Sequence, residues 1–429
     1  MIGDLSRLVQ AAVGDRSCVV ALGGGADSAV LLAASAKALD AVRAVFVNHG
    51  LDASTDLRAA AERLAEGLGI PLTILEAVVP NGPNLEERLR DARYRAIEAN
   101  LDDDEVCCTG HTRDDQAETV LMRVLRGSGP TGLSGIPASR GPFRRPFLEI
   151  SRQTLRNVAL ASDLAFTDDP SNTDPRFLRS KIRSELIPHI ESEYGPSFRS
   201  NLALSGRLIG DDADVVLQQA NQIPIRTSPT EVAIPTAPLV LAPRAVATAS
   251  IRTALSSFYF PHGGSHTDIE AVYATAIDGK QRSLSGDLVS IRENAELVVA
   301  SKAAPDIDET VAVTVGKRFA WHGSSYNVFM SASPALHHTT GRRTALEATH
   351  KAGYVVRAAV EGDRIDIDGG STPVSEVLRA AGVPARKRPS WPVVMADGRI
   401  AAIAGVRVAP WARPVLGQPA VIIERDHPL

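Results

Sequence analysis

The sequence predicts an α/β protein: a doubly wound parallel sheet, followed by a mainly helical middle domain and a small α+β C-terminal domain. Over the first third, short apolar runs alternate with amphipathic segments, a pattern typical of parallel strands covered by helices on both faces. From about residue 205 this alternation stops, and 429 residues are too many for one ordinary core. We therefore expect domains at 1–200, 201–305 and 306–429.

The first predicted strand leads directly into a glycine-rich loop. An apolar run at 18–22 is followed by Gly-Gly-Gly-Ala-Asp-Ser at 23–28 and then by an Ala/Leu-rich helical segment. Glycines let a backbone approach a ligand closely, and the first N–H groups of a helix lack intrahelical acceptors, so the loop is suited to an anion. No Lys follows in the G-K-[ST] arrangement, so a Walker A loop is not expected. The alternative is an ordinary strand–helix turn.

The remaining elements of this region place three loops together. We expect strands at 44–48, 72–78 and 106–109, and helices at 56–68, 84–98 and 114–125. In parallel sheets, ligands bind beyond the carboxyl ends of strands. The loop at 23–28, residues 48–50 and residues 110–112 should therefore line one edge, which brings His49 and His111 to it. Either histidine alone is as readily explained by packing or surface exposure.

The helix expected after residue 112 begins with carboxylates. Asp114 and Glu118 are four residues apart and Asp115 and Glu118 three apart, so each pair shares a helix face. Facing a phosphate loop, they could bind Mg²⁺, which prefers oxygen ligands. The alternative is that they only complement the positive end of the helix dipole.

Two basic clusters stand out against a net charge of -4. The first, within residues 123–156, includes Arg126, Arg144 and Arg145, and the second is the run of residues 386–388. The net charge argues against a protein whose whole surface binds nucleic acid, and a lone basic cluster is commonly a solvated face. Two clusters in a chain that also carries a predicted anion-binding loop favour a polyanionic substrate.

Composition restricts the class of protein further. Hydrophobic residues make up 44% and charged residues 22%, as in soluble globular proteins. No apolar run has membrane-spanning length and the N-terminus lacks a secretion signal, so we expect a cytoplasmic protein without membrane contact. The three cysteines, Cys18, Cys107 and Cys108, form no CxxC pair and support neither a zinc site nor a disulfide framework.

Gly-Gly-Ala-Asp-Ser at 24–28 resembles the pyrophosphate loop of ATP pyrophosphatases, which cleave ATP between its α and β phosphates and adenylate a substrate. Several segments together resemble the signature of the tRNA(Ile)-lysidine synthetase family, namely residues 47–51, 84–94, 110–137, 168–172 and 177–183. That resemblance is nearly continuous from 18 to 188, weak in the middle region, and resumes at 361–394. This sequence departs from the family at Gly23, Asn48, Thr112, Phe177 and Ser180, where Ser, Asp, His, Tyr and Asn are usual.

The resemblance implies an enzyme that uses ATP and Mg²⁺ to join L-lysine to the wobble cytidine of an isoleucine tRNA with a CAU anticodon. In this interpretation ATP binds the loop at Gly23, Gly24, Gly25, Ala26, Asp27 and Ser28, with His49 and Arg179. The expected catalytic residues are Asp27, Asp114, His111 and Arg183, with Asp114 or His111 as the acceptor of the lysine proton. The expected Mg²⁺ ligands are Asp27, Asp115 and Glu118. The expected tRNA contacts are Arg126, Arg144, Arg145, Arg386, Lys387 and Arg388.

Two alternatives stay open from the sequence. One is another ATP pyrophosphatase, such as a tRNA thiolase, although thiolases usually carry more cysteines. The other is a tRNA-binding protein that has lost catalysis, which Gly23 in place of Ser suggests. The oligomeric state, including a homodimer, is also open.

Overall fold

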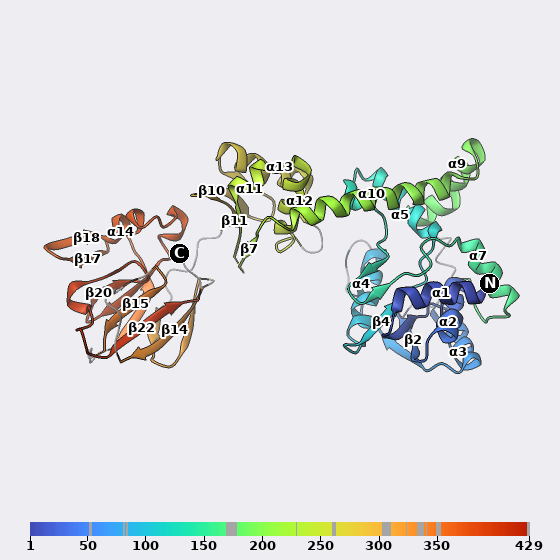
Figure 1. Cartoon of the computed structure of the whole chain (residues 1–429), viewed down its shortest axis with the longest axis horizontal. Helices are drawn as coiled ribbons and strands as arrows, with labels where there is room; N and C mark the ends of the chain where they lie inside the picture. Colours follow the sequence, from blue (N-terminus) through green and yellow to red (C-terminus); the bar gives the residue numbers. More distant parts are fainter. Residues whose placement is uncertain are drawn as a thin grey trace. The chain divides into compact units, whose positions relative to one another are not determined.

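The computed structural model places the chain in two compact units (Figure 1). These are unit 1, Met1–Val216, and unit 2, Leu217–Leu429. The structure describes residues 1–50, 54–79, 82, 85–168, 178–228, 230–259, 263–302, 310–322, 324–332, 339, 341–348 and 353–426. The three-domain division expected from the sequence stays a prediction, and its boundary at 305/306 lies outside the described residues.

Unit 1 alternates helices and strands as the sequence predicts. Its elements are α1 (Ile2–Val13), β1 (Ser17–Ala21), α2 (Ala26–Ala38), β2 (Val42–Asn48), α3 (Ser54–Leu68), β3 (Leu72–Glu76), α4 (Leu85–Glu98), β4 (Glu105–Cys108), α5 (Arg113–Leu125), α6 (Pro130–Leu133), β5 (Ser139–Arg140), β6 (Phe143–Arg144), α7 (Arg152–Ala161), α8 (Leu178–Lys181), the π-helical turn η2 (Ile182–Leu186), α9 (Ile187–Tyr194) and α10 (Phe198–Ala220), which runs into unit 2.

The sheet of unit 1 has the strand order β3-β2-β1-β4-β6-β5. β1 pairs in parallel with both β2 and β4, β2 with β3, and β4 with β6, whereas β5 is antiparallel to β6. The chain leaves β1 toward β2 and later returns to the other side of β1 at β4. The order therefore reverses between β1 and β4, which is where open α/β sheets bind ligands. The predicted fold class is confirmed for this unit.

The core of unit 1 explains why these residues form these elements. β1 is buried along its centre, and α2 is buried over the continuous stretch 29–35 because α1 and α7 pack against it. Leu5, Val9 and Val13 recur every four residues on α1 and join the same core as α2. The sequence analysis did not predict α1, although this apolar spacing is typical of an amphipathic helix.

Unit 2 combines a mixed region with a strand-rich C-terminal region. Its elements are β7 (Arg226–Thr227), β8 (Glu231–Pro235), α11 (Thr236–Leu241), α12 (Arg244–Leu255), α13 (His266–Asp278), β9 (Arg282–Ser283), β10 (Leu288–Glu293), β11 (Glu296–Ser301), β12 (Thr310–Val313), β13 (Arg318–Trp321), β14 (Ser324–Ser331), β15 (Arg343–Glu347), β16 (Tyr354–Ala358), β17 (Arg364–Ile367), β18 (Gly370–Pro373), α14 (Val374–Ala380), the 3₁₀ turn η3 (Ala385–Lys387), β19 (Pro392–Ala396), β20 (Arg399–Ile403), β21 (Arg407–Val408), the 3₁₀ turn η4 (Pro410–Ala412) and β22 (Ala420–Arg425).

The middle region contains more strand than the sequence predicts. The proline-rich segment 224–243 includes β8, which pairs with β11 in a five-stranded sheet of order β7-β8-β11-β10-β9. Its only proline within the strand, Pro235, is the last residue, where a missing ladder donor costs least. Within this sheet β9 and β10 pair in antiparallel fashion, and β10 also pairs with β11, with Glu293 opposite Glu296.

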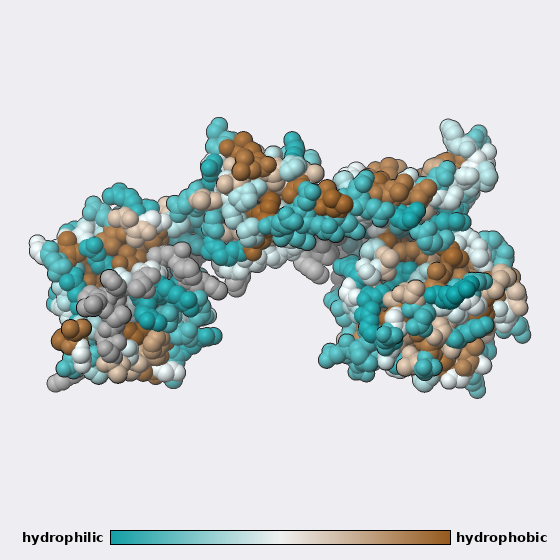
Figure 2. All heavy atoms as spheres, viewed as in Figure 1, coloured by the Kyte–Doolittle hydropathy of each residue, from teal (hydrophilic) through white to brown (hydrophobic). Residues whose placement is uncertain are grey.

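The C-terminal region forms two main sheets around one core. Their orders are β12-β16-β19-β20-β21 and β13-β14-β22-β15, and every pairing within them is antiparallel. Trp391 is 5% exposed and packs inside this core. The described residues contain no helix that is both long and apolar enough to cross a bilayer. Apolar side chains are nevertheless exposed, and Figure 2 shows such surface over the α10 region, to which Leu204 and Leu208 belong.

Candidate active site

The glycine loop follows β1 and begins α2. Gly24 has a φ of +80°, and a Cβ at this position would lie 2.4 Å from the carbonyl oxygen of Leu57. Gly110, after β4, packs on the loop so closely that its Cβ would lie 3.2 Å from backbone atoms of Asp27 and Ser28. Only glycine fits at Gly24, where both the space and the backbone conformation exclude a side chain. The loops after β1 and β4 therefore meet, as the sequence predicts.

Gly23 is different from Gly24. Its φ is not positive, and no atom of the described residues lies within 4 Å of where a Cβ would be. Its N–H donates to the Ser28 hydroxyl oxygen at 3.2 Å, and that hydroxyl donates to the carbonyl oxygen of Gly25 at 2.9 Å. The serine that the family has at this position would therefore fit the present backbone.

Asp27 lies in the first turn of α2 and keeps one carboxylate oxygen free of hydrogen bonds. Its Oδ2 lies 3.6 Å from Nε of Arg152, while the buried Oδ1 has no partner among the described residues. Burial is the main reason that the pKa of Asp27 is raised to about 7, and the charges of Asp115 and Asp114 raise it further, against that of Arg152. An unpaired, buried carboxylate oxygen is costly and marks a position where a cation would bind.

The acidic residues of α5 are buried, and Asp115 belongs to a capping box with Thr112. Thr112 caps the helix: its hydroxyl accepts from the N–H of Asp115, and its own N–H and hydroxyl donate to Oδ2 of Asp115 at 2.8 and 2.7 Å. Asp114 accepts from Nη1 of Arg199 at 2.6 Å and from the backbone N–H of Arg152 at 2.8 Å. The helix-dipole interpretation of these acids is therefore correct in part, but their side chains also have specific partners.

Three arginines surround Glu118, whose side chain is 1% exposed. Arg152 and Arg183 donate to its Oε1 at 3.2 and 2.7 Å, and Arg179 and Arg183 donate to its Oε2 at 2.9 Å each. The same three arginines reach Oδ1 of Asp115 at 2.8 to 3.5 Å. Burial by itself would raise the pKa of both carboxyls, but these arginines outweigh it, so both pKa values lie below the usual range.

The two histidines lie at the predicted edge and are neutral near pH 7. His111 shares a hydrogen bond of 2.8 Å with the hydroxyl of Thr109, and burial is the main reason that its pKa falls to about 3. His49 accepts from Nε of Arg93 at 3.4 Å, and its pKa falls to about 4, first through burial and then through the charge of Arg93. A neutral ring can accept a proton or a hydrogen bond, which a cationic one cannot.

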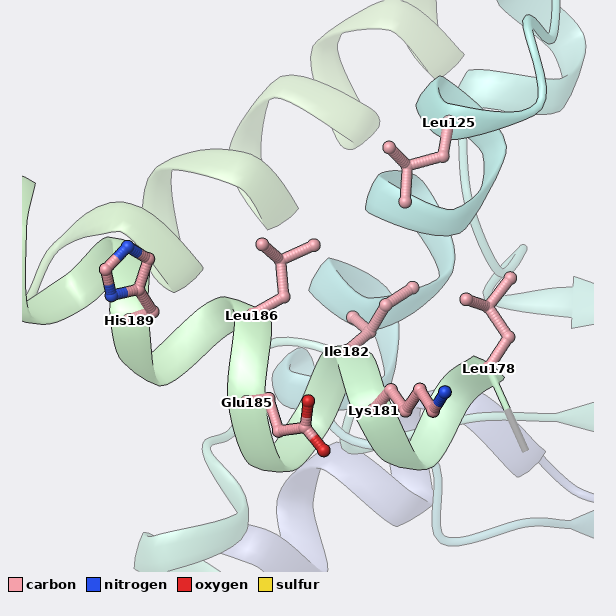
Figure 3. Close-up of a pocket in the computed structure, with 7 residues that line it drawn as sticks. All are labelled: Leu125, Leu178, Lys181, Ile182, Glu185, Leu186 and His189. Carbon is pink, nitrogen blue, oxygen red and sulfur yellow. The ribbon is translucent and has the colours of Figure 1, made fainter. Parts of the chain in front are cut away.

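The helix that carries Arg179 and Arg183 has a second, apolar face. Leu178, Ile182 and Leu186 recur every four residues along it, and Figure 3 shows them on the side of Leu125 from α5. Together with charged residues at the rim, they line a pocket of about 320 Å³. The cationic face reaches the acids while the apolar face packs toward the end of α5, so one helix anchors to α5 in two ways.

The basic residues expected to contact tRNA differ in exposure within unit 1. Arg126 ends α5 and is exposed. Arg144 is half-buried and donates to nearby backbone carbonyls. Arg145 is 4% exposed and donates to the carbonyl oxygen of Pro137 and the hydroxyl of Tyr94. Arg145 therefore packs inside the unit, whereas Arg126 is open to a partner.

In unit 2 the basic turn η3 is held by carboxylates. Arg386 donates to Glu293 at 2.9 and 3.1 Å and to Glu231 at 2.6 Å, and Lys387 donates to Glu231 at 2.7 Å. Nε of Arg388 donates to a backbone carbonyl at 2.9 Å. Burial would raise the pKa of Glu231, but the hydrogen bond from Lys387 and the charges of both cations hold it below its usual value. The expected phosphate contacts are thus engaged within the protein.

Two residues of the site were missed by sequence reasoning. Arg152 was noticed only as part of a basic cluster, and Arg199 was not noticed at all. Arg152 opens α7 and Arg199 lies on α10, far from α5 in the sequence. An arginine that pairs with a distant carboxylate leaves no periodic signal, so only the tertiary structure identifies these partners.

Comparisons with known proteins agree with this arrangement. A family model described as PP-loop domain matches residues 3–190, and one described as TilS substrate C-terminal domain matches residues 355–414. The tRNA(Ile)-lysidine synthase of Pseudomonas aeruginosa is 44% identical over 202 residues, which cover 44% of this chain and 46% of that protein. The tRNA(Ile)-lysidine synthase of Streptomyces coelicolor is 36% identical over 306 residues, which cover 66% of this chain and 84% of that protein.

The match thus spans about half the length of the Pseudomonas protein and most of the Streptomyces protein. Among solved structures, the U34-tRNA thiolase NcsA from Methanococcus maripaludis is similar with a TM-score of 0.38 and 19% identity, covering 49% of this chain and 80% of that chain. That likeness is too low to support a functional conclusion.

Proposed function

The chain belongs to the tRNA(Ile)-lysidine synthase family, and on that basis we propose that it joins L-lysine to the wobble cytidine of an isoleucine tRNA with a CAU anticodon. Membership of this family makes it a ligase, and the PP-loop domain implies the use of ATP. In the proposed reaction ATP adenylates the carbon-2 oxygen of the cytosine and pyrophosphate leaves. The side-chain amine of lysine then displaces AMP and gives lysidine.

The observation that carries this proposal is the meeting of the glycine loop with a charge-balanced cluster at the β1/β4 reversal. Four carboxylates, of Asp27 and the three acids of α5, face four guanidinium groups. First-turn N–H groups and arginines are suited to phosphate oxygens, because both are preorganised donors. Negative charge that develops as pyrophosphate leaves would meet donors already in place, which lowers the barrier without reorganisation.

The residues present fit one Mg²⁺ ion held largely by phosphates. Among the described residues no group of three or more His, Cys, Asp or Glu side chains could hold a metal. Asp115 and Glu118 have all their oxygens hydrogen-bonded, whereas Oδ1 of Asp27 has no hydrogen-bond partner among the described residues. Mg²⁺ commonly uses one or two carboxylates together with substrate phosphates, and it neutralises their charge. We therefore assign the protein ligand to Asp27 and treat Asp115 and Glu118 as partners of the arginines.

Arg179 and Arg183 are suited to act on the phosphates of the adenylating step. Each reaches two carboxylates, and the planar guanidinium group has the geometry for bidentate contacts with phosphate oxygens. Arriving phosphates would compete for these donors with Asp115 and Glu118. The acids thus keep the arginines extended and in place before the nucleotide binds.

The lysine amine must lose a proton before or during its attack. Asp114 is poorly suited as the acceptor, because both of its oxygens already accept hydrogen bonds from Arg199 and Arg152. His111 is neutral and is therefore the better candidate, although a pKa of about 3 makes it a weak base in the ligand-free protein. Nearby phosphate charge would raise that pKa and strengthen the base.

For tRNA we propose contacts to phosphates from Arg126, Arg144 and the basic turn at 386–388. Buried Arg145 is left out, because it is already bonded inside unit 1. Phosphate contacts position an RNA but do not read its sequence, so other residues must distinguish the anticodon. An enzyme that modifies tRNA must be in the compartment that contains tRNA, and we propose that this protein is located in the cytoplasm.

The direct test is an assay of the modified nucleoside. The purified protein is incubated with ATP, Mg²⁺, L-lysine and an isoleucine tRNA transcript with a CAU anticodon, and nucleoside masses are measured. A transcript of the same sequence with a GAU anticodon is the control. We expect a lysine adduct at the wobble cytidine and pyrophosphate release only with the first transcript. Folded protein that gives no adduct with intact transcript would refute the proposal.

The same assay separates the alternatives. A tRNA-binding protein that has lost catalysis would retain the transcript without releasing pyrophosphate. A thiolase would release pyrophosphate in the absence of lysine. Against this alternative, all three cysteines are buried in strands β1 and β4, where a sulfur donor could not reach them.

A further inference from the structure

The four carboxylates of the site lie on two helices, and no hydrogen bond joins the acid of one helix to the acids of the other. Asp27 lies on α2 after β1, and Asp114, Asp115 and Glu118 lie on α5 after β4. Backbone packing at Gly110 brings the loops after β1 and β4 together. Like charges repel, so the Asp27 side chain also needs a cationic partner to lie beside the acids of α5.

Arg152 contacts all four of these carboxylates. Its backbone N–H donates to Asp114 at 2.8 Å, Nη2 donates to Asp115 at 2.8 Å, and Nη1 donates to Glu118 at 3.2 Å. Its Nε lies 3.6 Å from Oδ2 of Asp27, which is an ion pair but too long for a hydrogen bond. One guanidinium group thus links the glycine loop to the acidic helix.

The local structure fixes where this guanidinium can go. Ser151 caps α7, its hydroxyl accepting from the N–H of Thr154 at 3.1 Å, and Arg152 is the first helical residue. α7 also packs along α2, the helix that carries Asp27. The side chain is only 27% exposed and has two strong hydrogen bonds to α5, so its position is determined before any ligand binds.

The ion pair between Arg152 and Asp27 leaves one carboxylate oxygen of Asp27 available to a cation. Arg152 faces Oδ2, and Oδ1 stays without a partner among the described residues. A bidentate pair would occupy both oxygens, as Arg156 does one turn later on α7 with Asp168, at 2.7 and 2.9 Å. The looser geometry at Arg152 orients the acid without competing for the oxygen that would bind a cation.

We propose that Arg152 is a positioning residue that holds Asp27 in register with the acidic helix, so that Oδ1 of Asp27 would be available to a Mg²⁺ ion that accompanies the nucleotide. This inference rests on the proposed function and adds to it a residue that acts through the carboxylates of the site. Its consequence is specific: loss of Arg152 should weaken the use of Mg²⁺ and slow pyrophosphate release without weakening tRNA binding.

The test compares Arg152→Lys with Arg156→Lys in the full-length protein. The two arginines are four residues apart on α7, and the same substitution at Arg156 leaves the four carboxylates untouched. Lysine keeps the charge but is a single point donor, so it cannot reach three carboxylates at once. Arg152→Gln serves as a second variant if Arg152→Lys does not fold.

For Arg152→Lys we expect kcat of pyrophosphate release to fall by about 30- to 100-fold, the scale of a catalytic group misplaced by about 1 Å. KM for tRNA should stay within about threefold of the wild-type value, since the Arg152 guanidinium contacts the carboxylates beside the glycine loop and the proposed tRNA contacts lie elsewhere. Titration calorimetry without tRNA should show that Mg²⁺ increases ATP affinity less than in the wild type. Arg156→Lys should match the wild type in all three.

Three results would overturn the inference. Equal kcat in the two lysine variants would show that Arg152 does not position Asp27. A parallel rise in KM for tRNA and loss of thermal stability would assign Arg152 a purely structural role. An unchanged effect of Mg²⁺ on ATP affinity would contradict the link to Asp27, and this measurement stands even if the wild type fails to release pyrophosphate, which would refute the proposed function separately.

Discussion

The basic turn of unit 2 offers the sharpest test of the proposed tRNA contact, because its cations are already paired. Glu231 makes two of the three ion pairs that hold Arg386 and Lys387, and Glu293 makes the third. If these cations bind tRNA phosphates, the carboxylates compete with the RNA. Replacing Glu231 with Gln should therefore strengthen tRNA binding.

The size of this effect follows from the geometry. The side chains of Glu231, Arg386 and Lys387 are 12%, 26% and 27% exposed, so each ion pair is worth about 1 kcal/mol, the upper end for exposed pairs. Two pairs give about 2 kcal/mol, and glutamine would recover part of it by hydrogen bonding. At about 1.4 kcal/mol per factor of ten, Glu231→Gln should tighten tRNA binding by about tenfold.

Glu296→Gln is the matched control for the long-range effect of charge. Glu296 lies on β11 of the same sheet, directly opposite Glu293, but it pairs with Arg226 instead of the basic turn. Both variants remove one negative charge, so both gain the same general attraction for RNA. Binding would be measured by fluorescence anisotropy with labelled transcript at several salt concentrations, because phosphate contacts depend on salt. Equal affinities of the two variants, or weaker binding by Glu231→Gln, would refute the reasoning.

The remaining predictions concern unit 1. Asp27→Asn should abolish pyrophosphate release while tRNA retention persists; equal loss of both would make Asp27 structural. Because the pKa of Asp27 is raised from 3.8 to about 7 by folding, its contribution to stability is complete below about pH 4 and is lost as pH rises from about 4 to 7, by at most about 4 kcal/mol. In ligand-free protein Asp27→Asn should therefore flatten the fall in unfolding free energy between about pH 4 and 7. An unchanged pH profile in denaturant titrations would contradict this. Gly23→Ser should fold normally, because nothing among the described residues lies within 4 Å of the added Cβ, and its hydroxyl should lower KM for ATP; a loss of thermal stability would show that the space at Gly23 is not usable. Gly24→Ala should abolish ATP binding in calorimetry, since its Cβ would lie 2.4 Å from a backbone oxygen, and normal ATP binding would show that the loop adapts. Glu118→Gln leaves three arginines with one fewer carboxylate, so it should lower the free energy of unfolding by about 3 kcal/mol and the unfolding temperature of unit 1 by roughly 10 °C. If its unfolding temperature changes less than that of the exposed variant Glu62→Gln, the buried-pair argument is refuted.

Much of the fold could be read from the sequence because strand and helix periods are local properties. The alternation of apolar runs and amphipathic segments predicts β1 to β4 and the helices between them, and the structure moves their ends by only one or two residues. Where the local signal is weak, prediction fails. β8 lies in a proline-rich segment and forms because β11 pairs with it, which no local pattern indicates.

For the site, the sequence by itself determined the glycine loop, the acids of α5 and their approach to each other, because parallel strands end at one edge of a sheet. Only the tertiary structure decided the partners of each charge. Glu118 is enclosed by arginines from α7, α8 and η2, and Arg386 is bound to carboxylates more than ninety residues away in the sequence. Charge pairing depends on the distance between side chains and on their burial, and the amino-acid sequence alone gives neither quantity. The chemistry of the loop is therefore a property of the sequence, whereas the electrostatic balance that prepares it is a property of the fold.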